Sequence, residues 1–254
     1  MDHDIGHLLN NWDFEPDEFL ARRIEADDGS EKIQIRIDMG ILQLETAGRP
    51  DGTLPFGYSS LLDYHLAQVE ASEEGAFTFD EDQCENLFQE AWQFYHRYLS
   101  LFYLEDYAGV VEDTEHTLNI FDLVDQFAPN DEVRWYFEQY YPHAIMMQTR
   151  ARAMIALESE NYPTALNAVE EGIANIENFI EEWESEIEEE IPELSFLREW
   201  HEELEQERPL TQREQLERDL DEAVAAENFE EAARLRDKIQ TLWPGPHRLF
   251  RPER

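Results

Sequence analysis

Two apolar stripes at helical spacing, each opened by a capping signal, constrain residues 210–242 more tightly than any other stretch. Thr211 and Glu214 form a capping box, in which each side chain satisfies a free backbone N–H of the first helical turn. Asn228 and Glu231 repeat this spacing at the start of a second segment. The apolar positions recur at intervals of three and four residues, namely Leu216, Leu220, Ala223 and Val224, then Ala232, Leu235, Ile239 and Leu242. This pattern predicts a short antiparallel helical hairpin that turns at residues 226–228 and stops at Pro244-Gly245-Pro246.

The second half of this stretch carries a recognisable residue pattern. It holds Ala225, Glu227, Phe229, Glu230, Ala232, Ala233, Leu235, Arg236, Asp237 and Ile239. This pattern closely resembles the UVR (UvrB/UvrC) motif, a protein-docking hairpin found in excinuclease subunits, Clp-type ATPases and a protein-arginine-kinase activator. The resemblance implies a contact module and no chemistry. The protein-binding residues that we expect are Phe229, Ala232, Leu235, Arg236 and Ile239.

Charge composition restricts the partners. The formal net charge is −41, with 60 acidic residues against 19 Lys and Arg, of which only Lys32 and Lys238 are lysines. A surface this negative is repelled by DNA, RNA and anionic lipid, and it suits basic proteins or cations. We therefore expect no direct nucleic-acid contact. An acid-rich, lysine-poor composition is also typical of a salt-adapted cytoplasm, which would explain the charge without a function.

Targeting and redox features are few. Cys84 is the single cysteine, which excludes an intramolecular disulfide and a cysteine zinc cluster. The acidic N-terminus lacks the basic and apolar regions of a signal peptide, and no apolar run approaches the length of a membrane span. The sequence predicts a cytoplasmic protein that does not enter a membrane.

The first 75 residues show β-type patterning. Residues 19–24 read as a short strand, residues 27–30 as a turn, and residues 32–44 as the returning strand of a hairpin. The returning strand alternates apolar and polar residues, and the alternation slips after Gly40, where we expect a bulge. A helical interpretation of the same residues also fits. Trp12 and Phe14 are expected to pin the polar N-terminal arm, and Ser59 or Ser60 to cap a following helix. This region resembles that of poorly characterised bacterial proteins that also end in a UVR hairpin.

Residues 80–190 show dense helical periodicity. Helices are predicted from about 80 to 104, then to Pro129, then from Asp131 to Leu157 with a kink or break at Pro142, and from Pro163 onward. Seven glutamates lie within residues 181–190, and the apolar stripe passes through them. We therefore expect the fourth helix to continue with an acidic face until Pro192 ends it.

An internal repeat relates two of these helical pairs. Tyr107 aligns with Tyr162 at an offset of 55 residues, and each unit reads as helix, short turn with an aromatic residue, helix. The second unit resembles a tetratricopeptide (TPR) repeat, with Ala153, Tyr162 and Ala165 at the small and aromatic positions. The first unit departs from that pattern. The UVR hairpin has the same kind of turn, with an aromatic residue followed by a small one. We attribute this likeness to the geometry that tight helical hairpins share.

Together these features predict a mainly α fold with TPR-like helical hairpins, a small N-terminal β-hairpin and a C-terminal UVR helical hairpin. The expected divisions are an N-terminal β-hairpin and helix region, the TPR-like hairpins, a charged linker or helix, the UVR hairpin and a tail, at residues 1–75, 80–190, 191–209, 210–242 and 243–254.

No catalytic constellation, metal site or cofactor motif is legible. The eight histidines are scattered and are expected to be structural. The strongest polar grouping comprises Arg36 and Asp38 on the predicted strand, with Arg49 and Asp51 in the predicted turn at residues 48–52, which reads GRPDG. One interpretation is a docking pocket or an ion pair that holds the turn in place. The other is that these residues form the solvent-exposed face of a strand and its turn. An aromatic strip from Trp92 to Tyr141 is expected to be core, or to line a peptide groove.

These observations favour a non-enzymatic adaptor that docks a protein partner, or a second copy of itself, through the UVR hairpin, together with a TPR-like groove. One alternative is an accessory factor of nucleotide excision repair recruited through the motif. Another is an enzyme or ligand-binding protein that uses the N-terminal β element.

Overall fold

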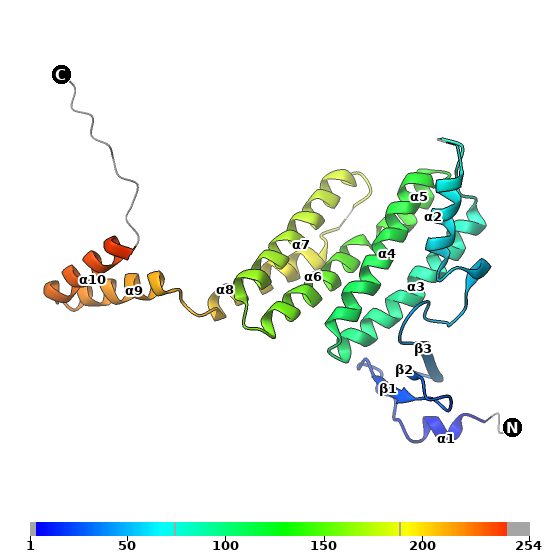
Figure 1. The fold of residues 1–254 in the computed structure, drawn as a ribbon, viewed down its shortest axis with the longest axis horizontal. Coiled ribbons are helices and arrows are strands. Elements are labelled where there is room, and N and C mark those ends of the chain that lie inside the picture. Colours follow the sequence, from blue (N-terminus) through cyan, green and yellow to red (C-terminus); the bar gives the residue numbers. More distant parts are fainter. Residues whose placement is uncertain (1–3, 74, 188, 243–254) are drawn as a thin grey trace. The chain divides into compact units, whose positions relative to one another are not determined.

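The computed structural model describes residues 4–73, 75–187 and 189–242. The chain divides into two compact units, residues 1–204 and residues 205–254. The predicted fold class is confirmed: helices dominate, a small sheet lies near the N-terminus, and a helical hairpin forms the second unit (Figure 1). The predicted tail, residues 243–254, and its Pro-Gly-Pro stop lie outside the described residues.

The first unit holds most of the secondary structure. Its elements are α1 (Gly6–Leu9), β1 (Ala21–Glu25), β2 (Glu31–Ile37), β3 (Gly40–Glu45), η1 (Pro55–Gly57), α2 (Leu61–Ala71), α3 (Glu81–Tyr103), α4 (Tyr107–Phe127), α5 (Asp131–Glu138), α6 (Tyr141–Leu157), α7 (Tyr162–Glu182) and α8 (Pro192–Glu207). None of the helices in the described part of the chain is long and apolar enough to cross a lipid bilayer.

The sheet has three antiparallel strands in the order β1-β2-β3, rather than the two that we predicted. Ile37 pairs with Gly40, so Asp38 and Met39 form a two-residue turn and not part of a continuous strand. The bulge expected at Gly40 is therefore wrong. A bulge and a tight turn both change the phase of an apolar alternation, and the sequence pattern does not distinguish them.

Both faces of this sheet are covered. On one face, Ile33, Ile35 and Leu44 pack against the end of α3, the start of α4 and the middle of α6. On the other face, Arg22 donates two hydrogen bonds to Gln34 Oε1, at 3.0 and 2.7 Å. The guanidinium of Arg22 lies 4.0 Å from the ring centroid of Trp12. The N-terminal arm is thus held by an aromatic contact, as expected.

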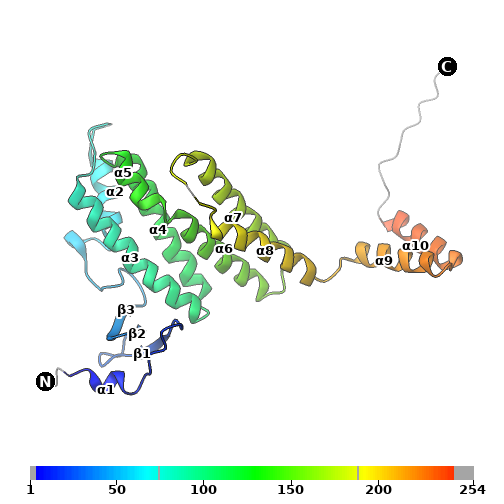
Figure 2. The same cartoon turned by 180° about the vertical axis from the view of Figure 1, so that it is seen from behind.

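Four long helices form two antiparallel pairs, α3 with α4 and α6 with α7, and both views show them side by side (Figure 2). The helix predicted from Asp131 to Leu157 is broken before Pro142, which lies in the first turn of α6. Proline suits this position because its missing N–H would have no helical partner there. The resemblance to TPR repeats stays a prediction.

The three helical hairpins share one turn geometry. The residue before each N-cap has a left-handed backbone, with φ of 60° at Glu105, 53° at Glu160 and 56° at Glu227. In each turn the N-cap N–H donates back across six residues, as Asp106 does to Leu101 at 2.8 Å. Asn161 and Asn228 make the equivalent bonds to Ala156 and Ala223. This is the Schellman pattern, which satisfies carbonyls that the helix end leaves free.

The glutamate-rich segment corrects the prediction for α7. The helix ends at Glu182, and Pro192 begins α8 instead of ending a helix. Trp183 is buried against Trp135, with ring centroids 5.4 Å apart. The guanidinium of Arg134 lies 5.1 Å from the Trp183 ring. These long-range contacts surround the side chain at the point where the chain leaves the helix.

The second unit contains the predicted hairpin, formed by α9 (Gln212–Ala225) and α10 (Phe229–Leu242). The predicted capping box is confirmed, because Thr211 N–H donates to Glu214 at 2.8 Å and Glu214 N–H donates to Thr211 Oγ1 at 3.3 Å. Asn228 caps α10 by accepting from Glu231 N–H at 3.4 Å.

Candidate functional site

The tip of the C-terminal hairpin carries exposed apolar side chains. Val224, on the last turn of α9, is 50% exposed, and Phe229, the first residue of α10, is 69% exposed. They flank the turn at residues 226–228, so both lie at the same end of the hairpin. Exposed apolar side chains that gather at one place on a surface are typical of sites that a partner covers.

The five residues expected to bind protein divide by burial. Phe229 is exposed, and so is Arg236, which lies 3.1 Å from Asp237 in a solvent-exposed ion pair. Leu235 and Ile239 are half-buried. Ala232 is 7% exposed and lies within the hairpin, where its small size permits close helix packing. The side chains free to meet a partner are therefore at the tip and along the outer part of α10.

An ion pair between Arg208 and Glu214 stabilises the start of the hairpin. Arg208 donates two hydrogen bonds to Glu214, at 2.8 and 2.7 Å. These bonds, together with those from Thr211, hold the pKa of Glu214 far below its ordinary range. The carboxylate also lies in the first turn of α9, where negative charge favours the helix dipole. This contact ties the segment before α9 to its N-terminus.

The four residues of the polar grouping fall into two separate clusters. Arg49 and Asp51 lie together: Arg49 NH1 is 3.4 Å from Asp51 Oδ2 and donates to Thr53 Oγ1 at 2.6 Å. Asp51 also accepts from Gln93 Nε2 at 3.1 Å. Burial opposes ionisation of Asp51, but the hydrogen bonds from Thr53 and Gln93 outweigh it, and the pKa of Asp51 is lowered.

Arg36 and Asp38 lie at the other cluster, where β2 turns into β3. Arg36 donates to the backbone carbonyl of Trp12 at 2.8 Å and to that of Gly40 at 3.0 Å, and the Asp38 carbonyl accepts from it at 3.2 Å. A guanidinium that serves several carbonyls at once stabilises a turn. This geometry gives Arg36 a structural role at the turn.

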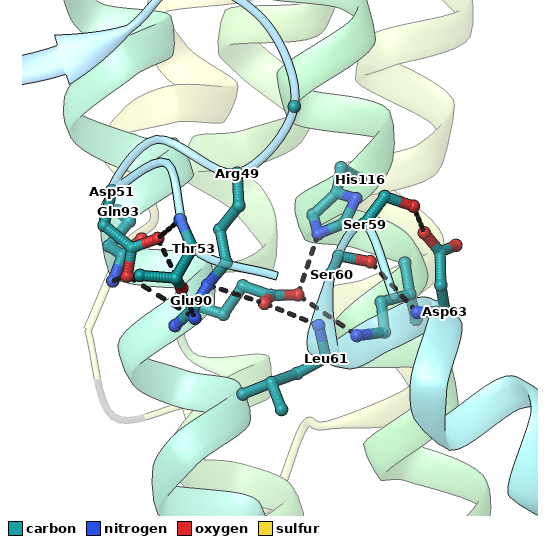
Figure 3. Close-up of polar contacts among 12 residues, drawn as sticks. Arg49, Asp51, Thr53, Ser59, Ser60, Leu61, Asp63, Glu90, Gln93 and His116 are labelled. Carbon is teal, nitrogen blue, oxygen red and sulfur yellow. Dashed lines mark hydrogen bonds and ion pairs between the residues drawn. The ribbon is translucent and has the colours of Figure 1, made fainter. Parts of the chain in front are cut away.

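At the centre of the Arg49 cluster is a side chain that the sequence did not point to, Glu90 of α3 (Figure 3). It is fully buried and accepts the backbone N–H groups of Leu61 at 2.7 Å and Leu62 at 3.1 Å, which begin α2. Arg49 Nε lies 3.1 Å from Glu90 Oε2, and His116 Nε2 lies 3.1 Å from Oε1. A buried carboxylate requires such partners, because an unpaired charge in the interior is costly.

A second buried ion pair lies about two helical turns further along the same face of α3. Arg97 donates to Asp113 of α4 at 2.7 and 2.6 Å, in the bidentate geometry that guanidinium and carboxylate prefer. It also donates to the carbonyl of Gly48 at 2.7 Å. Burial nevertheless raises the pKa of Asp113. Glu90 and Arg97 thus fasten the loop at residues 48–53 to the helical body.

One sequence signal, which our predictions did not use, would have pointed to Glu90 and Arg97. Glu90 and Arg97 stand on the same helical face as Leu87, Phe94 and Leu101, at spacings of three and four residues. A charged residue within an apolar stripe indicates a buried, paired group. Among the described residues, no cluster of three or more His, Cys, Asp or Glu side chains has the arrangement to hold a metal ion.

Comparison with known proteins identifies only the hairpin. Residues 211–242 match the UvrB/uvrC motif, which covers α9, α10 and the cap before them. No curated protein and no solved structure matches the chain. The match begins at the N-cap residue Thr211 and includes all five residues expected to bind protein.

Proposed function

We propose that this protein is a non-enzymatic adaptor that docks a protein partner through the hairpin at residues 211–242. The observation that carries the proposal is the exposed Phe229 at the tip of a hairpin that matches a motif of the excinuclease system. The hairpin is held by its own caps and turn, so its outer apolar side chains are available for a partner.

The contact surface follows from burial. Val224 and Phe229 form its apolar centre, the half-buried Leu235 and Ile239 extend it along α10, and Arg236 contributes a polar edge. Aromatic side chains at the centre of an interface commonly account for a large share of the binding free energy. A similar hairpin, on another protein or on a second copy of this chain, offers a complementary apolar stripe. The net charge of −41 disfavours direct contact with nucleic acid.

The test is a quantitative binding comparison of the full chain with its Phe229→Ala variant. We expect about a 30-fold loss of affinity for the captured partner, which corresponds to a hot-spot contribution of about 2 kcal/mol. Sedimentation of the purified chain measures whether the partner is a second copy. Unchanged helicity by circular dichroism shows that the hairpin is intact.

Phe56→Ala is a matched control, because Phe56 is 72% exposed but lies outside the hairpin. This variant is expected to bind like the wild-type chain. Equal binding by the wild-type, Phe229→Ala and Phe56→Ala chains would exclude the hairpin tip as the docking surface.

A second candidate function is supported by the motif match alone, namely a role as an accessory factor in nucleotide excision repair. Recruitment would use the same hairpin, with a partner in the repair machinery. Deletion of the gene in its source organism should then increase sensitivity to ultraviolet light. Survival equal to that of the parent strain would count against a repair role and leave the docking proposal unaffected.

A further inference from the structure

A cavity of about 300 Å³ lies in the first unit, and Glu90 and its partners Arg49 and His116 are not among the residues that line it. Its walls come from α3, α4, the link between α5 and α6, the start of α6 and the first turn of α8. Aromatic rings dominate the lining, and they belong to Phe88, Trp92, Tyr95, Tyr98, Phe121 and Tyr140.

The cavity has a buried floor and an accessible rim. Tyr98 and Phe121 are 2% and 3% exposed, whereas Trp92 and Tyr140 are 46% and 40% exposed. Trp92 stacks on Tyr95 with ring centroids 4.8 Å apart and an interplanar angle of 8°. Tyr95 in turn packs edge-on against Tyr98, with ring centroids 5.3 Å apart. The aromatic lining thus runs from the buried floor to the exposed rim.

One charged group is built into this wall. Glu193, in the first turn of α8, has a side chain that is 21% exposed, and its Oε1 lies 3.7 Å from Nδ1 of His143. Interaction with His143 holds the pKa of Glu193 below its ordinary value, so the carboxylate is charged at neutral pH. No lysine or arginine is among the residues that line the cavity, and His143 is the one lining side chain that is able to carry positive charge.

We propose that this cavity binds a small alkylammonium cation. The face of an aromatic ring is electronegative and attracts an ammonium group, most strongly where water is excluded. The carboxylate of Glu193 supplies the balancing charge, and the rings supply apolar contact for the alkyl groups. The net charge of −41 adds a long-range field that attracts cations and repels anions. A neutral aromatic ligand would fill the same space but gain no attraction from the carboxylate of Glu193.

The first experiment compares a cation with its uncharged isostere. Choline and 3,3-dimethylbutan-1-ol have nearly the same shape, and only choline carries a charge. Calorimetric titration of the full chain, in sodium phosphate at low ionic strength, is expected to give at least about tenfold tighter binding of choline. Equal affinities would overturn the selection for a cation. Failure of both compounds to bind would overturn the site.

The second experiment assigns the binding to this cavity. Trp92→Leu and Glu193→Gln are each expected to weaken choline binding by about tenfold. Glu190→Gln is the matched control, because it removes the same charge from the same segment but Glu190 does not line the cavity. If Glu193→Gln and Glu190→Gln weakened choline binding equally, the loss would come from the chain's overall negative charge. That result would overturn the assignment of binding to this cavity. Tyr140→Leu, also on the exposed rim, replaces any variant whose thermal midpoint falls.

Discussion

At the scale of single residues, Glu138 shows how burial changes one carboxyl group. It lies at the end of α5 and is 7% exposed. Burial, together with the negative charges of Asp125, Asp122 and Glu182, raises its pKa to about 7 against the opposing effect of Arg134. Loss of hydration and repulsion by like charges both favour the protonated form.

This shift predicts a pH-dependent stability. The pKa of Glu138 in the folded chain lies above its value of about 4.5 in the unfolded chain. The stabilising contribution is therefore fully present below about pH 4.5 and is lost as pH rises through about 7. Glu138→Gln mimics the protonated form. The free energy of unfolding of this variant, relative to wild type, should rise by at most roughly 3 kcal/mol between pH 5 and pH 8.

Urea denaturation across this range measures the difference. Glu132→Gln is the matched control, because Glu132 is exposed on the same helix and its substitution removes the same charge. Its unfolding free energy relative to wild type should vary little with pH, since only the general repulsion of a chain with a charge of −41 changes. Parallel profiles for Glu138→Gln and Glu132→Gln would contradict the assignment.

At the scale of elements, Gly172 determines how closely α7 approaches α6. A Cβ atom at this position would lie 2.2 Å from Thr149 Oγ1 and 2.7 Å from its Cγ2. Real Cβ atoms do not approach other atoms this closely, so the two helices would have to separate. The interface therefore depends on a residue with no side chain, although glycine is a poor helix former.

Gly172→Ala is therefore expected to destabilise the protein by about 1–3 kcal/mol, because overpacking outweighs the gain in helix propensity of about 1 kcal/mol. Thr149→Ala removes the two nearest atoms, so the double variant should lose less than the sum of the single variants. A double-mutant cycle from denaturant unfolding measures this coupling. Additive losses would show that the two positions do not meet.

At the scale of the whole molecule, the two units differ in how much core they hold. The first unit contains three clusters of buried apolar side chains. In the described part of the second unit, the buried side chains are those of Leu216 and Ala232. A hairpin with so small a core is only marginally stable, because little apolar surface is removed from water.

Hydrogen exchange of the full chain should reveal this difference. Backbone amides of α9 and α10 are expected to exchange through local opening, far faster than those of α3, α4 and α6. Saturation with the docking partner should then slow exchange in α9 and α10, since binding stabilises the folded hairpin by mass action. Equal protection of both units in the unbound chain would contradict this prediction. Phe56→Ala should leave the exchange pattern of the hairpin unchanged.

Much of the helical framework could be predicted because its determinants are local. The capping residues Ser60, Thr211 and Asn228 and the break before Pro142 act within about one helical turn, so the sequence displays them directly. The UVR hairpin was legible for the same reason: its caps, turn and apolar stripes are adjacent along the chain. The two-residue turn at Asp38 and Met39 was missed because its sequence pattern equals that of a bulge.

The sequence by itself thus determined the helical class, most helix starts and the C-terminal helical hairpin, because short-range hydrogen bonds and apolar periodicity suffice for these. The tertiary structure decided which polar side chains meet. It separated Arg36 and Asp38 from Arg49 and Asp51, and placed the unforeseen Glu90 against the start of α2. It also ended α7 at Glu182, and the following residue, Trp183, packs on Trp135. Such contacts join segments far apart in the chain, and their free energy depends on burial that no local pattern specifies.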